Sequence, residues 1–116
     1  RRLVSGWVAD PDPLVVRAAV ATICEPRLLR TAEAAGFALA TCRAATDALL
    51  AVPAEHRREP AVRTLRQALG YCWSVAVAAD PAGLPEFLAL GGDPDLEWIV
   101  RENRGKARLK KLLPDR

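Results

Sequence analysis

The 116-residue chain lacks a long apolar run, although 51% of its residues are hydrophobic. No stretch reaches the roughly 18 consecutive apolar residues of a membrane-spanning helix, so we expect no such helix and no membrane partner. Arg1 and Arg2 open the chain, but Asp10 and prolines follow shortly, which excludes a secretory signal in the chain as given. A chain of this length has room for one domain, assigned to residues 1–116.

Methionine is absent, so the chain has no initiator residue. Its first apolar stretch (Leu3, Val4, Trp7 and Val8) begins without a preceding helix cap. We therefore expect that residues are missing upstream and that the chain is a fragment of a longer protein.

Cysteine is scarce, with three residues at wide spacing: Cys24, Cys42 and Cys72. Each lies among Ala, Val, Ile or Trp, which predicts buried, reduced thiols in a reducing compartment and hence a cytoplasmic location. A disulfide between two of them is the alternative.

Groups that carry catalysis or bind metals are also few. One histidine and no Cys-x-x-Cys motif leave zinc without an adequate ligand set. The histidine, His56, lies in a charged segment expected to be an exposed loop. Gly91-Gly92 is not followed by Lys-Ser or Lys-Thr, so it is no phosphate loop. We predict no cofactor, no catalytic residue and no small-molecule substrate, and enzyme activity is not favoured.

Positive charge is concentrated near the C-terminus. Residues 101–111 carry +5, and the whole chain carries +3, which leaves −2 for the remainder. A break at Gly105 predicts a second short helix beginning near Lys106. The basic residues of this tail either stabilise helix ends or contact phosphates without reading sequence.

Apolar positions recur at helical spacing along most of the chain, and Pro and Gly separate the apolar runs. This pattern predicts an all-α fold with helices over 13–24, 27–52, 60–79, 85–90 and 94–104. The second helix is either continuous or broken at Gly36. The helix that begins at Pro60 is apolar on almost every side, so we expect it to be the most buried. Gly70 within it predicts the close approach of a neighbouring helix, the alternative being a ligand-facing pair of Tyr71 and Trp73.

A repeated pattern is the strongest signal. Three segments contain an acidic residue and a proline, followed by an apolar residue directly before an arginine; they lead to Arg17, Arg66 and Arg101. The arginines are 49 and 35 residues apart, which brackets the roughly 40–47-residue period of HEAT arrays. Because one helical hairpin cannot bury its apolar face alone, about three hairpins stacked in an α-α superhelix (a HEAT- or ARM-like solenoid) are expected. Each arginine would reach an acidic turn of its own or a neighbouring repeat, or line a concave binding face.

The chain thus resembles HEAT-repeat proteins, and more narrowly the C-terminal half of the alkylpurine DNA glycosylase HEAT family. The segment from Trp7 to Arg17-Ala-Ala-Val resembles that family's Trp…Arg-Arg-x-Ala-Ile element. Leu65-Arg66-Gln-Ala-Leu-Gly-Tyr71 resembles its Ile-Arg-Lys-Ala-Ile-Gly-Trp helix, and 80–109 resembles its last hairpin. The resemblance covers nearly the whole chain and implies the fold.

The catalytic feature of that family has no counterpart here. The family places an aspartate four residues after a tryptophan, where it stabilises the sugar cation formed as a damaged base departs. In this chain Trp7, Trp73 and Trp98 are followed at that spacing by Pro11, Val77 and Glu102. Arg17 matches a DNA-contacting arginine of the family, and Val16 replaces its neighbouring arginine. Base excision would therefore require a catalytic acid outside this chain.

Two functions remain. The first is an interaction scaffold that presents one face to a protein partner. The second is a non-sequence-specific nucleic-acid-binding domain. Candidate contact residues for either are Arg17, Arg66, Arg101, Arg104, Lys106, Arg108, Lys110 and Lys111.

Overall fold

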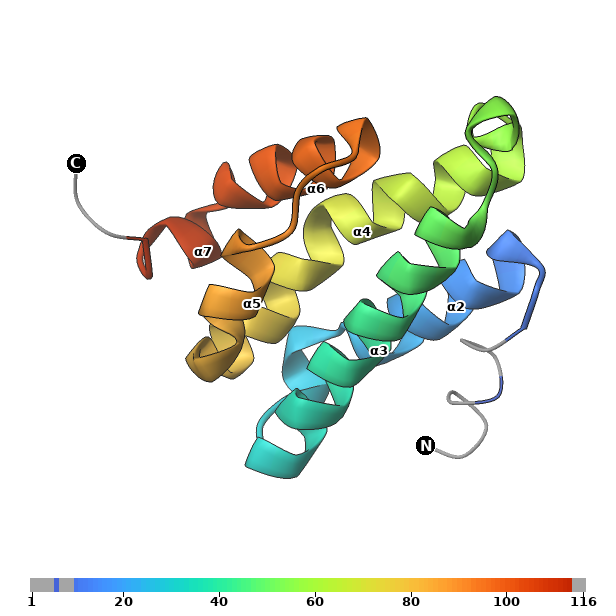
Figure 1. Cartoon of the computed structure of the whole chain (residues 1–116). Helices are drawn as coiled ribbons and strands as arrows, with labels where there is room; N and C mark the ends of the chain where they lie inside the picture. Colours follow the sequence, from blue (N-terminus) through green and yellow to red (C-terminus); the bar gives the residue numbers. More distant parts are fainter. Residues whose placement is uncertain (1–5, 7–9, 114–116) are drawn as a thin grey trace.

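The computed structural model describes residue 6 and residues 10–113, and in that part of the chain every regular element is a helix (Figure 1). The prediction of an all-α fold is therefore confirmed. The main helices are α2 (Pro13–Ile23), α3 (Ala32–Ala51), α4 (Pro60–Ala79), α5 (Leu84–Leu88), α6 (Pro94–Arg104) and α7 (Ala107–Lys110). Short 3₁₀ turns lie between them at Pro26–Leu28, Ala54–His56 and Pro81–Gly83.

The acid–proline pattern starts three of these helices. The Asp12 carboxylate accepts from the Leu14 N–H at 2.9 Å at the start of α2, and Asp93 accepts from the Asp95 N–H at 2.8 Å at the start of α6. Proline suits the first helical position, which has no intrahelical acceptor for its nitrogen. Helix α4 also begins at a proline, and its preceding Glu59 makes no side-chain cap.

The prediction of one helix over 27–52 was wrong at its N-terminal end. Residues Pro26–Leu28 form a separate 3₁₀ turn, and α3 begins only at Ala32. Thr31 caps α3 by accepting from the Ala34 N–H at 3.0 Å, a start signal that apolar spacing does not reveal. The helix then continues through Gly36, where the sequence allowed a break.

Two layers of helices form the domain. Its extents are 37 × 34 × 18 Å, and the smallest of these matches the thickness of two packed helices. Helix α4 packs against α2, α3 and α6, and Figure 1 shows α2, α4 and α6 running in the same general direction while α3 runs back. Eleven of the 20 residues of α4 are buried, more than in any other helix, as its apolar pattern predicted.

Close packing at Gly70 is confirmed. A Cβ at this position would lie 2.9 Å from two ring carbons of Trp98, so only glycine leaves room for α6. The alternative of a ligand-facing pair is wrong, because Trp73 is 1% exposed and its indole N–H donates to Thr46 Oγ1 at 3.0 Å.

A buried amide joins α6 to α4. The Asn103 side chain is fully buried; its Nδ2 donates to the Leu69 carbonyl at 2.9 Å and to the Ile99 carbonyl at 2.7 Å, and its Oδ1 accepts from the Ser74 N–H at 2.8 Å. Every hydrogen-bonding position of this amide except one carbonyl lone pair is thereby used. The contact sets the register of α6 along α4.

The three cysteines are free and buried, as predicted. The structure brings Cys24 and Cys42 together, with their sulfurs 3.5 Å apart. The thiol contact with Cys42 and burial raise the pKa of Cys24, so the thiol is protonated at neutral pH. The reducing compartment itself stays a prediction.

No helix in the described part of the chain is long and apolar enough to cross a membrane. The first apolar stretch (Leu3, Val4, Trp7 and Val8), from which missing upstream residues were expected, lies outside the described residues.

Candidate site for an anionic partner

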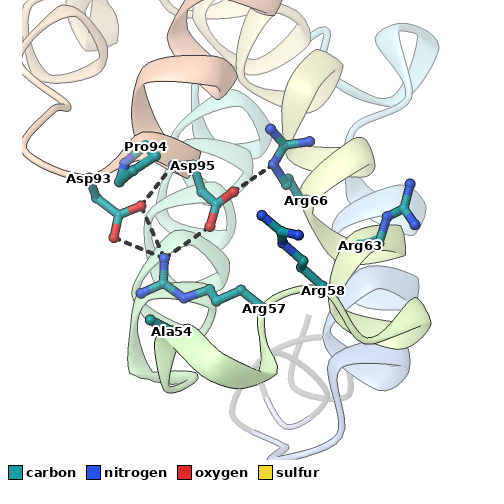
Figure 2. Close-up of a pocket in the computed structure, with 8 residues that line it drawn as sticks. All are labelled: Ala54, Arg57, Arg58, Arg63, Arg66, Asp93, Pro94 and Asp95. Carbon is teal, nitrogen blue, oxygen red and sulfur yellow. Dashed lines mark hydrogen bonds and ion pairs between the residues drawn. The ribbon is translucent and has the colours of Figure 1, made fainter.

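Arginines gather around a hollow of about 600 Å³ where the α3–α4 connection and the first turns of α4 face the start of α6 (Figure 2). We call it the arginine hollow; its lining residues are Ala54, Arg57, Arg58, Arg63, Arg66, Asp93, Pro94 and Asp95. Four arginines and two aspartates give it a net charge of +2. Of these residues, the sequence had indicated only Arg66 as a contact residue.

Arg57 is the structural centre of the hollow. Its Nη1 donates to both carboxylate oxygens of Asp93, at 3.0 and 2.9 Å, and to Asp95 Oδ2 at 3.0 Å. Its remaining donors reach the carbonyls of Val52 at 2.8 Å and Leu50 at 3.2 Å, at the end of α3. Only 14% of the side chain is exposed. Arg57 therefore ties the end of α3 to the start of α6.

The charges of this centre are mutually stabilised. Hydrogen bonding to Asp93 raises the pKa of Arg57 above its already high value. Burial raises the pKa of Asp93, but the bonds from Arg57 and from the Asp95 N–H outweigh it and leave that pKa below its usual value. Both Arg57 and Asp93 are thus charged at neutral pH.

Arg66 is held in place from two sides. Its Nε donates to Asp95 Oδ1 at 2.7 Å, and its guanidinium carbon lies 3.8 Å from the centre of the Trp98 ring. Trp98 is itself packed against Gly70. The prediction that a repeated arginine reaches an acidic turn is confirmed for Arg66, whose partner Asp95 lies at the start of α6.

Arg58 and Arg63 differ from the other two arginines. Both are exposed, and neither side chain has a hydrogen bond or an ion pair with any residue that the structure describes. Figure 2 shows Arg58 lying between the Asp95–Arg66 pair and Arg63. The hollow therefore combines two fixed arginines with two that are available to a ligand.

These residues carry a weak signal in the sequence. Arg57 and Arg58 are adjacent in a charged segment, and Arg63 and Arg66 are spaced to lie on one side of a helix. Nothing in that segment indicates that Asp93 and Asp95, about 30 residues further on, complete the hollow.

The three repeated arginines do not occupy equivalent positions. Arg17 lies four residues after the first residue of its helix, Arg66 six and Arg101 seven. Since successive helical residues turn by roughly 100°, Arg17 and Arg66 point in nearly opposite directions relative to their helix starts. Arg17 and Arg101 are exposed, and neither has an ion pair within the described residues.

The basic tail forms a separate surface. Arg101, Arg104, Arg108, Lys110 and Lys111 are exposed and Lys106 is half-buried. The predicted second helix is present as α7, anchored by the fully buried Leu109. Arg108 also donates to Ser74 Oγ at 3.3 Å.

The residues expected to have no catalytic or metal-binding role have local partners. His56 Nδ1 lies 2.6 Å from Glu59 Oε2, and both side chains are exposed. Asp10 accepts from the Asp12 N–H at 2.8 Å, as expected of a turn residue. Within the described residues, no cluster of three or more His, Cys, Asp or Glu could hold a metal ion.

Comparison with known proteins gives no family assignment. No protein-family model matches the chain, and neither the curated proteins nor the solved structures contain a match. The resemblance to the HEAT glycosylase family therefore stays a prediction.

Proposed function

We propose that this chain is a HEAT-type helical-repeat domain that binds an acidic segment of a protein partner at the arginine hollow. The observation that carries the proposal is the pair Arg58 and Arg63, two exposed arginines without an ion pair in the described structure, beside an arginine held in a fixed position. Arginine presents planar, paired donors that match a carboxylate, so such a group is suited to a discrete anionic ligand.

The arrangement of helices supports the HEAT-type interpretation. Helices α2, α4 and α6 each begin at a proline preceded by an acidic residue, and α4 packs against both of the others. Helix α3 runs back between α2 and α4 in the chain, as the other arm of a hairpin does (Figure 1). Hairpins that share a core in this way can extend into longer arrays.

The distribution of charge favours a protein segment over a nucleic acid at this site. Outside residues 101–111 the chain carries a net charge of −2, so the hollow is a local positive feature on an otherwise acidic domain. A nucleic-acid backbone requires several phosphate contacts along its length. The acidic side chain of a protein segment requires contacts at one anionic group only.

Binding to a fluorescently labelled peptide rich in glutamate tests the proposal. The variant Arg58→Gln/Arg63→Gln removes both available arginines, and Lys110→Gln/Lys111→Gln makes the same change of charge in the basic tail. We expect the first variant to bind about tenfold more weakly or worse and the second to bind nearly as the parent does. Equal losses in the two variants would mean that overall charge, and not the hollow, holds the peptide.

The exposed basic tail supports a second candidate, nucleic-acid binding. Five of its six basic side chains are exposed while Leu109 fixes the backbone beneath them. Labelled single- and double-stranded DNA and RNA, titrated across a salt series, would then bind with a steep salt dependence. Here Lys110→Gln/Lys111→Gln should weaken binding more than Arg58→Gln/Arg63→Gln does. No binding at low salt would mean that the basic residues of the tail stabilise helix ends and do not contact phosphates.

A further inference from the structure

We infer that the preferred ligand of the arginine hollow is a phosphate monoester, of the kind carried by a phosphorylated serine or threonine of the partner. This rests on the proposed function, because it specifies which acidic group of a protein segment the hollow selects.

The acceptors inside the hollow are already occupied. Asp93 receives two bonds from Arg57 and one from the Asp95 N–H. Asp95 receives one bond from Arg57 and one from Arg66. Neither carboxylate therefore has to be paired by Arg58 or Arg63, whose guanidinium groups stay available for an incoming anion.

The remaining charge matches a dianion. Four arginines and two aspartates leave +2 in the hollow. A phosphate monoester carries about −1.5 to −2 at neutral pH and offers three terminal oxygens, whereas a carboxylate carries one charge and two oxygens. The free donors of Arg66 and the exposed side chains of Arg58 and Arg63, which can reorient, supply hydrogen bonds for the phosphate oxygens.

The site is partly organised before a ligand arrives. Arg66 is fixed by Asp95 and by its stacking on Trp98, and it leaves its two Nη groups without a hydrogen bond to any described residue. Arg63 lies one helical turn before it on α4, and Arg58 comes from the preceding connection. Only the last two side chains must lose freedom on binding, which limits the entropic cost.

The size of the hollow admits more than a free ion. A volume of about 600 Å³ lies within the usual range of ligand sites, roughly 300–1,000 Å³. It can therefore accept a phosphorylated side chain together with part of its backbone. Figure 2 shows that two segments supply these arginines, with Arg58 coming from the connection and Arg63 and Arg66 from α4.

Three labelled peptides of one Gly/Ser-based sequence test the inference, carrying at the same position phosphoserine, glutamate or two consecutive glutamates. The two-glutamate peptide matches the charge of the phosphopeptide without its geometry. We expect the phosphopeptide to bind about tenfold more tightly than either carboxylate peptide. Arg58→Lys/Arg63→Lys keeps the charge and removes the paired donors, so it should abolish most of that preference. Thermal melting of each variant checks that the fold is intact.

The outcomes separate the two proposals. Equal binding of the phosphopeptide and the two-glutamate peptide would overturn the inference and leave the proposed function standing. Failure of all three peptides to bind would overturn both. If Lys110→Gln/Lys111→Gln loses phosphopeptide binding and the hollow variants do not, the phosphate binds at the basic tail. That result would also overturn the inference. If a 5′-phosphorylated dinucleotide competes better than the phosphopeptide, the ligand of the hollow is the phosphorylated end of a nucleic acid and not a segment of a protein.

Discussion

Replacement of Arg57 by alanine should cost this domain a large part of its stability. The substitution removes five hydrogen bonds, three of them to the carboxylates of Asp93 and Asp95. Removing one partner of a buried ion pair costs about 3–5 kcal/mol, because the other charge stays buried without compensation. Here about a fifth of each carboxylate side chain is exposed, at 22% and 20%, and Asp95 keeps its bond to Arg66. We therefore expect a loss nearer ~2–3 kcal/mol.

Urea denaturation followed by tryptophan fluorescence measures this loss, and thermal melting gives a second value. For a domain of this size 1 kcal/mol corresponds to about 4 °C, so the melting temperature should fall by roughly 8–12 °C. Arg63→Ala is the matched control, since it removes an exposed arginine of the same hollow and should change the free energy of unfolding by less than about 0.5 kcal/mol. A loss below about 1 kcal/mol in Arg57→Ala would refute the structural role given to this residue.

A double variant tests the reason for the loss. If the cost arises from unpaired carboxylates, Arg57→Ala/Asp93→Asn should be more stable than Arg57→Ala alone, because one of the two partly buried charges is gone. Non-additivity of about 1 kcal/mol is the expected size for groups in direct contact. Strict additivity of the two substitutions would show that the lost bonds to the α3 carbonyls, and not the ion pairs, stabilise this corner.

Further predictions concern the α4–α6 contact and the response to acid. Asn103→Leu should cost about 2–3 kcal/mol in urea denaturation, because it leaves buried backbone groups of α4 without their partner, and a loss below about 1 kcal/mol would count against that role. Gly70→Ala gains about 1 kcal/mol of helix propensity but forces Trp98 to move, at a cost of about 1–3 kcal/mol. We therefore expect a net loss of stability and a changed tryptophan emission spectrum. An unchanged spectrum would contradict the close contact. The pKa of Asp93 is below its ordinary 3.8, so its stabilising effect is complete above that pH and is lost as the pH falls through the lower value. The stability gap between the parent and Arg57→Ala should therefore narrow as the pH falls below 3.8, and a constant gap would show that Asp93 is not the coupled group.

The sequence by itself determined the elements of the fold. Proline after an acidic residue marked the starts of α2, α4 and α6, because Asp12 and Asp93 can cap a helix and proline fits its first position. Apolar spacing identified α4 as the most buried helix, and Gly70 indicated the close approach of a neighbour. These properties are local, since they depend on residues within one or two helical turns of each other.

The tertiary structure alone decided which side chains meet. Arg57 and Arg58 are neighbours in the sequence, yet the packing of α6 on α4 buries the first against Asp93 and Asp95 and leaves the second exposed. The partner of Arg66 likewise comes from 29 residues away. Side-chain periodicity describes one helix at a time, whereas the charge and availability of each arginine depend on how separate helices pack. The arginine hollow therefore emerges only when α4, α6 and the connection before α4 are brought together.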